Sequence, residues 1–283
     1  MAVVRRDQAL LGEALIEPAE LGELEAFWDF FSNAPSDLGA VAEEVGGALC
    51  TSVLQAPGSA LFNRALGLGL RRAATEADVD AIVDFFDARG VEYGIALHPD
   101  ARPAELPVWL EARGLRPGYA WAKFSRPVSS PPQAETAFHV ERVGPERAAD
   151  FASVFTRAYG TPAFTEPWLA VPPGRAGWHC FVAYDGETPA ATGALHVTGT
   201  VGWLGMAGTL PEHRRKGAQG AILAARIEAA AETGCHVVVT ETGALEEGRP
   251  SNSYRNIVRA GFEEQYVRAN YLSSPAADTS GRP

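Results

Sequence analysis

Apolar residues recur with a helical period in the first half of the chain. Their spacing predicts a helix over residues 19–31, with its acidic residues on the face opposite the apolar one. A second helix is predicted over residues 76–89, with Thr75 as its N-cap and Gly90 as its stop. Shorter apolar runs predict strands, and a third helix fits between the last two. These strands are 65–70, 92–97 and 120–124, and the third helix is 104–113.

The second half repeats this alternation of strands and helices. Asp185-Gly186 predicts a tight turn between two of its strands. The strands are expected at 139–143, 180–184, 190–197, 203–209, 236–241 and 265–272, and the helices at 146–158, 217–233 and 251–260. The order indicates a mixed α/β fold with a hairpin and a central β–α–β crossover.

Both halves close with the same order of elements, which suggests a duplicated domain. In each half a helix, a strand and a second helix lead to a glycine and an apolar residue before the last strand; these pairs are Gly114-Leu115 and Gly261-Phe262. A stretch rich in Pro and Ser separates the halves. We therefore expect an N-terminal domain at 1–126, a linker at 127–137, a second domain at 138–273 and a flexible tail at 274–283.

Composition and charge narrow the function classes. A chain of 283 residues with 46% hydrophobic and 21% charged residues suits two folded domains and argues against a disordered chain. The formal net charge is -11. Residues 1–137 hold 11 basic and 20 acidic residues, whereas 138–283 hold 13 and 15. This acidity argues against nucleic acid and anionic membranes as partners.

The cysteines and the apolar runs point to the cytoplasm. Cys50, Cys180 and Cys235 are scattered and lack metal-ligand spacing, so we expect a reducing compartment and no metal site. No apolar run reaches the ~18 residues that a membrane span needs. The first residues carry no long apolar stretch after their two arginines, so we expect no secretory signal.

The most informative segment is residues 209–223, here called the phosphate loop. A predicted strand passes through Pro211 into Arg214-Arg215-Lys216, and Gly217 and Gly220 then open a helix. Unpaired N–H groups and the helix dipole make a helix N-terminus an anion site. A surface helix with a basic first turn is the alternative, but such cations oppose the dipole unless an anion neutralises them. The spacing matches neither a P-loop nor the Rossmann glycine pattern.

The phosphate loop resembles the acetyl-CoA motif of the GCN5-related N-acetyltransferases, the GNAT superfamily. The motif, Arg/Gln-x-x-Gly-x-Gly/Ala, stands here as Arg214-Arg-Lys-Gly217-Ala-Gln219, with Gln219 in place of Gly or Ala. Pro211 and Gly261-Phe262 fit the same family, and the match in order and spacing covers roughly residues 138–272. The resemblance implies two GNAT-like domains, each with a central, mostly antiparallel twisted sheet flanked by helices.

The resemblance also implies a co-substrate, acetyl-CoA or another acyl-CoA, and no metal. The backbone amides of residues 215–220 would hold the pyrophosphate, and the strand 206–209 would pair with the pantetheine arm. Ser253 and Asn256 on the last helix would face the cofactor. The residues implied for binding are Met206, Ala207, Thr209, Arg214, Arg215, Lys216, Gly217, Ala218, Gln219, Gly220, Ala221, Ser253 and Asn256.

The family's usual acid and base are absent by position. Trp203 stands about where the family often has a base, and Ile257 stands where it often has a proton-donating Tyr. A backbone N–H of Met206 or Ala207 is expected to stabilise the oxyanion.

Three replacements are open for the missing groups. Glu241 is a candidate base, Tyr254 or Ser253 a candidate acid, and His196 a group acting through water. Each has a structural alternative: Glu241 as a cap of the following loop, Tyr254 as an ordinary helix-face residue, and His196 as a structural histidine. Positioning alone supplies much of the rate in this chemistry.

We therefore expect an N-acyltransferase that moves acetyl from acetyl-CoA to a primary amine of a small molecule, as a monomer or homodimer. In the first half, Arg71-Arg72 precede a helix without the glycine pair, so this half is interpreted as a degenerate copy that does not bind CoA. The alternatives are a non-catalytic acyl-CoA sensor and a protein-modifying acetyltransferase.

Overall fold

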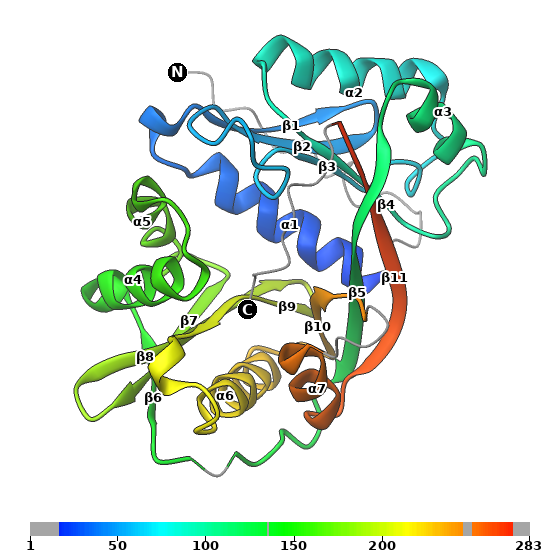
Figure 1. The fold of residues 1–283 in the computed structure, drawn as a ribbon. Coiled ribbons are helices and arrows are strands. Elements are labelled where there is room, and N and C mark those ends of the chain that lie inside the picture. The colour runs from blue at the N-terminus through cyan, green and yellow to red at the C-terminus, as the bar shows by residue number, and fades with distance from the viewer. Residues whose placement is uncertain (1–16, 135, 246–250, 274–283) are drawn as a thin grey trace.

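The computed structural model describes residues 17–134, 136–245 and 251–273 (Figure 1). The predicted tail 274–283 and the first 16 residues lie outside these ranges. The described strands form one 11-stranded sheet in the order β1-β2-β3-β4-β11-β5-β10-β9-β8-β7-β6. They are β1 (Ala40–Val45), β2 (Ala48–Val53), β3 (Arg64–Leu66), β4 (Gly94–Leu97), β5 (Arg116–Pro127), β6 (His139–Val143), β7 (Trp178–Asp185), β8 (Thr188–Thr198), β9 (Val201–Thr209), β10 (Val237–Gly243) and β11 (Glu263–Leu272).

The predicted helices are all present, with ends that differ by a few residues. The α-helices described are α1 (Pro18–Ser32), α2 (Glu76–Arg89), α3 (Leu106–Ala112), α4 (Ala148–Tyr159), α5 (Glu166–Leu169), α6 (Ala218–Glu232) and α7 (Asn252–Arg259). Helix α2 has the predicted bounds. The hydroxyl of Thr75 accepts from the N–H of Asp78, whose carboxylate accepts from the N–H of Thr75, and Gly90 ends the helix at φ 64°. This capping box explains why its N-terminus was readable from the sequence.

Two strands and one short α-helix were not predicted. The hairpin of β1 and β2 turns at Gly46 and Gly47, which have φ values of 58° and 75°. Strand β2 is buried along its whole length, so its sequence shows no alternation of apolar and polar residues. The other missed element, α5, is a single turn and too short to show a helical period.

The two halves share one sheet because they exchange their closing strands. We predicted a separate sheet in each half. Instead β11, the last strand of the second half, lies between β4 and β5 of the first. In turn β5, the last strand of the first half, lies between β11 and β10 of the second. The edges of β4 and β10 are therefore each covered by a strand from the other half.

Helix α1 occupies the space between the two halves of this sheet (Figure 1). It packs on β1 and β2 of the first half and on β8, β9 and β10 of the second. A Cβ atom on Gly22 would lie 3.2 Å from the Cβ of Trp203, so the helix backbone comes very close to β9. Helices α4 and α5 lie on the same side of the second half as α1, and α6 and α7 cover the opposite side.

Two acidic residues of α1 are buried. The pattern placed the acids of this helix opposite its apolar face, and Glu20 and Glu23 are 1% and 0% exposed. They belong to an ion cluster with Arg64, Lys123, Glu241 and Arg268. Because these cations lie on β3, β5 and β11, their charges compensate the buried carboxylates, and the helix pattern alone gives no sign of them.

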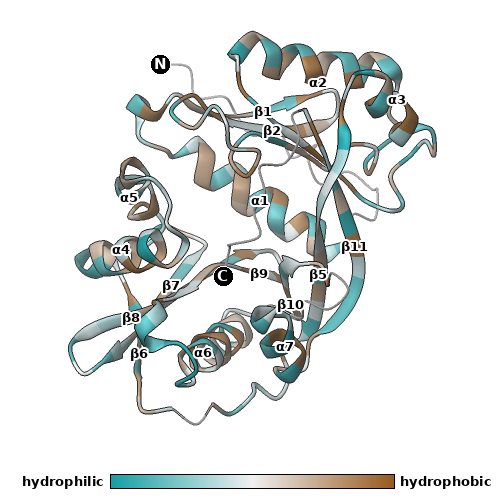
Figure 2. Ribbon diagram, viewed as in Figure 1, coloured by the Kyte–Doolittle hydropathy of each residue, from teal (hydrophilic) through white to brown (hydrophobic). Residues whose placement is uncertain are grey.

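The apolar core follows the layers. Apolar residues line the strands and the inner faces of the helices, and hydrophilic residues recur along α2 at the surface (Figure 2). Among the described residues no helix is long and apolar enough to span a membrane.

Candidate functional site

The phosphate loop forms a concave run of backbone at the start of α6. Its short turn Pro211–His213 leads to Arg215 and then Gly217, both of which have positive φ values, 63° and 89°. Gly217 is the N-cap, and the first helical bond runs from the N–H of Ala221 to its carbonyl (3.1 Å). The N–H groups of residues 218–220 therefore have no acceptor within the helix. Left-handed residues beside a helix N-terminus make an anion-binding concavity.

The side chains around this concavity leave it open and positive. Arg214, Arg215 and Lys216 are exposed. Arg214 Nε donates to the carbonyl of Thr209 (3.3 Å), and Lys216 Nζ lies 4.0 Å from the Asp185 carboxylate. A Cβ atom on Gly220 would meet nothing within 4 Å. Ala218, in contrast, is buried in the core and fixes the helix to the sheet.

Strands β9 and β10 separate beside the phosphate loop. They pair in parallel over three positions only, the last of which joins Trp203 and Val239. Beyond them the hydroxyl of Thr240 donates to the carbonyl of Leu204 (2.9 Å), in place of a backbone bond. The segment 205–209 thus lacks a strand on its β10 side, among the residues that the structure describes. This edge contains the predicted positions Met206, Ala207 and Thr209.

A bulge shapes the same edge. The register between β8 and β9 shifts between the pairs Thr192–Gly208 and Ala194–Gly205, and Met206 has a φ of 49°. The hydroxyl of Tyr159, at the end of α4, donates to the carbonyl of Ala207 (2.6 Å). Sequence reasoning missed Tyr159.

Helices α6 and α7 meet through three of the predicted binding residues. The side-chain amide of Asn256 donates to Gln219 Oε1 (2.5 Å), and Gln219 Nε2 donates to Ser253 Oγ (3.5 Å). Ser251 caps α7 through the N–H of Tyr254. Gln219, the residue that departs from the family motif, therefore ties the first turn of α6 to α7 beside the opening between β9 and β10.

Glu241 lies in the ion cluster, and residues 246–250 of the loop that it was expected to cap lie outside the described residues. Its Oε2 atom accepts from Lys123 Nζ (2.8 Å) and from an Arg268 guanidinium nitrogen (3.3 Å). Both cations use the same oxygen, which leaves Oε1 outside these ion pairs. The side chain is 14% exposed, the most of any carboxylate in the cluster.

The other acid and base candidates have partners of their own. The Tyr254 hydroxyl donates to Glu264 (2.6 Å), and this hydrogen bond raises the pKa of Tyr254. The proton is thus directed toward β11. His196 is buried and lies against the ring of Trp178, with Thr198 Oγ1 3.3 Å from its Nδ1. Its surroundings are those of a structural histidine.

Trp203 fills the position where the resemblance leads one to expect a base. Its ring lies on Gly205, where a Cβ atom would overlap it, and it stands edge-on to Phe27 of α1 at 5.9 Å. The indole is 6% exposed and makes this part of β9 apolar.

In the first half, helix α2 corresponds to α6, and the carboxylate of Asp78 occupies its N-terminus. Asp78 occupies the third position of α2, accepts from Thr75, and pairs with both terminal nitrogens of Arg72 (2.6 and 2.7 Å). The Arg72 hydrogen bonds, with those from Thr75, hold the pKa of Asp78 well below its usual value. A negative charge therefore already sits at this helix end.

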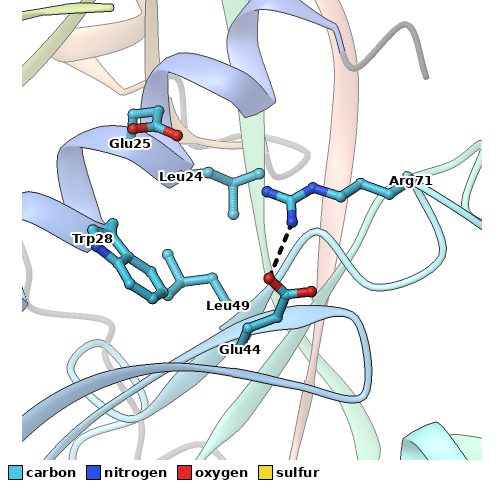
Figure 3. Close-up of a pocket in the computed structure, with 6 residues that line it drawn as sticks. All are labelled: Leu24, Glu25, Trp28, Glu44, Leu49 and Arg71. Carbon is cyan, nitrogen blue, oxygen red and sulfur yellow. Dashed lines mark hydrogen bonds and ion pairs between the residues drawn. The ribbon is translucent and has the colours of Figure 1, made fainter. Parts of the chain in front are cut away.

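Arg71 is similarly paired. It lies 3.4 Å from Glu44, above a hollow between α1 and the β1–β2 hairpin that Leu24, Trp28 and Leu49 also line (Figure 3). The Arg71 charge is therefore already paired at the surface. No group of three His, Cys, Asp or Glu side chains placed to hold a metal occurs within the described ranges.

Comparison with known proteins relates this chain to a family model and to solved structures. Residues 147–248 match the model of the Acetyltransferase (GNAT) family. The comparison with curated proteins gives no match. Among solved structures, a GCN5-related N-acetyltransferase from Kribbella flavida is similar, with a TM-score of 0.63 and 19% identity over 94% of this chain and 98% of that one.

Two further structures have the same fold. One is a GCN5-related N-acetyltransferase from Sphaerobacter thermophilus, with a TM-score of 0.58 and 18% identity over 72% of this chain and 69% of that one. The other is a tandem GNAT protein from the clavulanic acid biosynthesis pathway, with a TM-score of 0.56 and 14% identity over 93% of this chain and 98% of that one. At these identities the likeness shows a GNAT-like fold, a large sheet flanked by helices.

Proposed function

We propose that this chain, whose residues 147–248 match the acetyltransferase (GNAT) family, transfers an acyl group from an acyl-CoA to a primary amine of a small molecule. Acetyl-CoA is the first co-substrate to test. The observation that carries the proposal is the phosphate loop, where Arg215 and Gly217 curve the backbone and three exposed cations surround unpaired N–H groups. A pyrophosphate fits this chemistry because it is anionic and accepts several N–H bonds at once.

The free edge of β9 supports the next part of the proposal. An extended amide-containing arm that leaves the phosphate loop would run along residues 206–209, whose β10 side has no strand partner in the described chain. Strand-like pairing of such an arm uses main-chain hydrogen bonds. The acyl carbonyl would then lie at the bulge, within reach of the N–H of Met206 or Ala207.

Glu241 is our proposed general base, through Oε1. It lies on β10 at the separated end of the strand pair, and the Lys123 and Arg268 contacts fix its other oxygen. A fixed carboxylate is positioned for proton transfer from an ammonium or from an intervening water. Ser253 and Tyr254 stay predictions for the acid, and the Tyr254–Glu264 hydrogen bond weighs against the second.

The packing of α1 favours a small acceptor over a protein substrate. Phe27 and Gly22 of α1 lie against Trp203, on the side of β9 opposite α6. A protein tail needs a long groove along this side, and α1 fills that space. We therefore propose a small amine as the acceptor and a monomer or homodimer as the working form.

A non-catalytic acyl-CoA sensor is the second candidate. The observation in its favour is that both candidate catalytic groups are already engaged: Glu241 is paired with Lys123, and the Tyr254 hydroxyl donates to Glu264. Release of free CoA from acetyl-CoA, measured against a panel of small primary amines, separates the two. Turnover with at least one amine supports the enzyme. Tight acetyl-CoA binding without turnover on any of them supports the sensor.

A further inference from the structure

Among the described residues, one buried cation near the bulge has no carboxylate partner. Arg226 lies on the face of α6 that packs on the sheet and is 2% exposed. Within the described part of the chain its guanidinium makes no ion pair, and its hydrogen bonds go to backbone carbonyls alone. Burial lowers the pKa of Arg226 to about 10, so it remains charged at neutral pH.

Two of the three backbone carbonyls that Arg226 contacts belong to the register pair at one end of the shift. Nη1 donates to the carbonyl of Ala194 on β8 and to that of Gly205 on β9, both at 3.2 Å, while Nε donates to Ile222 of its own helix. Ala194 and Gly205 are the register pair at which the shift between β8 and β9 ends. The guanidinium is therefore bound at the place where the edge of β9 becomes free.

The absence of a side chain at Gly193 leaves space for the Arg226 guanidinium. A Cβ atom on Gly193 would lie 3.0 Å from both Cζ and Nε of Arg226, and 2.5 Å from Ile222. Any larger residue at 193 would push the guanidinium away from the strand. Burial of an unpaired charge costs several kcal/mol. An apolar residue at 226 would fill the same space without that cost. The charge itself therefore needs an explanation beyond packing.

We propose that Arg226 is a positioning residue for acyl transfer, whose charge polarises the Gly205–Met206 peptide group and so strengthens the N–H of Met206 as an oxyanion donor. This inference rests on the proposed function. The carbonyl of that peptide group accepts from the guanidinium. Hydrogen bonds in a chain strengthen one another, so the N–H at the other end of the same amide becomes a better donor.

The geometry gives this donor its direction. The peptide group is planar and trans, so its N–H points away from its C=O. Since the carbonyl of Gly205 shares Nη1 with Ala194 of β8, it points toward the β8 side. The N–H of Met206 then points toward β10, into the free side of the edge where the acyl carbonyl is proposed to lie.

The test measures the acyl carbonyl itself and needs no acceptor amine. Calorimetry first establishes that acetyl-CoA binds the full-length wild type and each variant. Infrared spectra of bound acetyl-CoA, labelled with carbon-13 at the thioester carbonyl, then report how strongly that carbonyl is polarised. The variants are Arg226→Lys, which keeps the charge, Arg226→Gln, which keeps a donor without charge, and Arg226→Met, which keeps the length alone.

We expect the carbonyl frequency of wild type and R226K to lie below that of R226Q and R226M at equal acetyl-CoA occupancy. With an amine that turns over, kcat of R226Q should fall about tenfold to a hundredfold at unchanged KM for acetyl-CoA, less than the 10²–10³ lost when an oxyanion donor is removed outright. A Gln variant with the wild-type frequency would overturn the role of the charge, as would equal shifts in R226K and R226Q. Acetyl-CoA that fails to bind the wild type would overturn the proposed function as well, and calorimetry detects this separately.

Discussion

Lys123 on β5 and Glu241 on β10 are directly opposite each other in the strand pair that joins the two halves, and Lys123 Nζ lies 2.8 Å from Glu241 Oε2. The same lysine contacts Glu23 of α1 at 2.8 Å. One buried cation thus ties the first helix of the chain, the exchanged strand of the first half and the proposed base of the second. Folding of the halves and placement of the site are therefore coupled.

The ion cluster predicts how stability depends on pH. Burial alone would raise the pKa of Glu23, but the charges of Arg268 and Lys123 outweigh it and hold this pKa well below 4.5; the pKa of Glu20 is lowered in the same way. Groups with a depressed folded-state pKa stabilise the protein above the unfolded value and lose that contribution as pH falls toward the folded one. We expect the free energy of unfolding to be level near neutrality and to decline below about pH 4.5.

Substitution of Glu23 by Gln should reproduce most of this loss at neutral pH. Removing one member of a buried ion cluster leaves its cations uncompensated, which costs about 3 to 5 kcal/mol. Urea unfolding of E23Q at several pH values provides the measurement, and the conservative exchange at half-buried Glu25 (E25Q) serves as the control on the same helix. A wild-type stability at neutral pH for E23Q would show that the cluster contributes little.

The exchange of β5 and β11 predicts that the halves unfold together. Strand β11 pairs with β4 and β5, and β5 pairs with β10, so neither half can lose its structure without exposing an edge of the other. Calorimetry of the full chain should give one transition with equal calorimetric and van't Hoff enthalpies. Two resolved transitions would mean that the halves are thermodynamically independent despite the shared sheet.

Gly220 offers a direct test of the phosphate loop. It holds the third position of α6, the place that Asp78 holds in α2, and its Cβ direction is open. We expect Gly220→Asp to recreate the self-capped helix of the first half and to abolish acetyl-CoA binding. An acidic residue in the first turn also favours the helix, so thermal stability should be kept or raised.

The controls for this prediction are G220A and G220N, which introduce a side chain without charge. Both should retain acetyl-CoA binding within about tenfold, a change of about 1.4 kcal/mol. Loss of binding in all three variants alike would point to steric exclusion instead of charge. If G220D bound acetyl-CoA as tightly as the wild type, the phosphate loop would not be the acetyl-CoA site.

Glu241 leads to a kinetic prediction. If Oε1 is the base, E241Q should lower kcat by about 10²–10⁴-fold with the affinity for acetyl-CoA unchanged. Lys123→Met, which removes one of the two partners of Oε2, is the matched control for damage to the cluster. Should K123M and E241Q reduce stability and kcat in parallel, Glu241 acts through the ion cluster and not as a base.

Local signals in the sequence predicted the local parts of the fold. Thr75 and Gly90 marked α2, and Gly217 and the arginines of the phosphate loop could be predicted together because they stand in one continuous segment. The exchange of β5 and β11 was not readable, since either closing strand could pair with either half by pattern alone. The burial of Glu20 and Glu23 was not readable because their cationic partners are distant in sequence: Arg64 lies on β3, and Lys123 and Arg268 are 100 and 248 residues away from Glu23 and Glu20, respectively.

Arg226 did leave a signal in the sequence. It stands between Leu223 and Ile227, which are buried on the sheet-facing side of α6, and a charged residue there needs a buried partner. The sequence pattern does not identify that partner, because the acceptors are backbone carbonyls of β8 and β9. Only the folded register brings Ala194 and Gly205 to one guanidinium.

The stoichiometry of acetyl-CoA binding tests the central claim most directly. Titration of the full-length protein by isothermal calorimetry should give one saturable site per chain that CoA competes for. The phosphate loop supplies that site, and Asp78 fills the corresponding helix end in the first half. Absence of binding would contradict the proposal that the protein binds acyl-CoA. Binding of two acetyl-CoA molecules per chain would contradict the proposal that only the second half binds it.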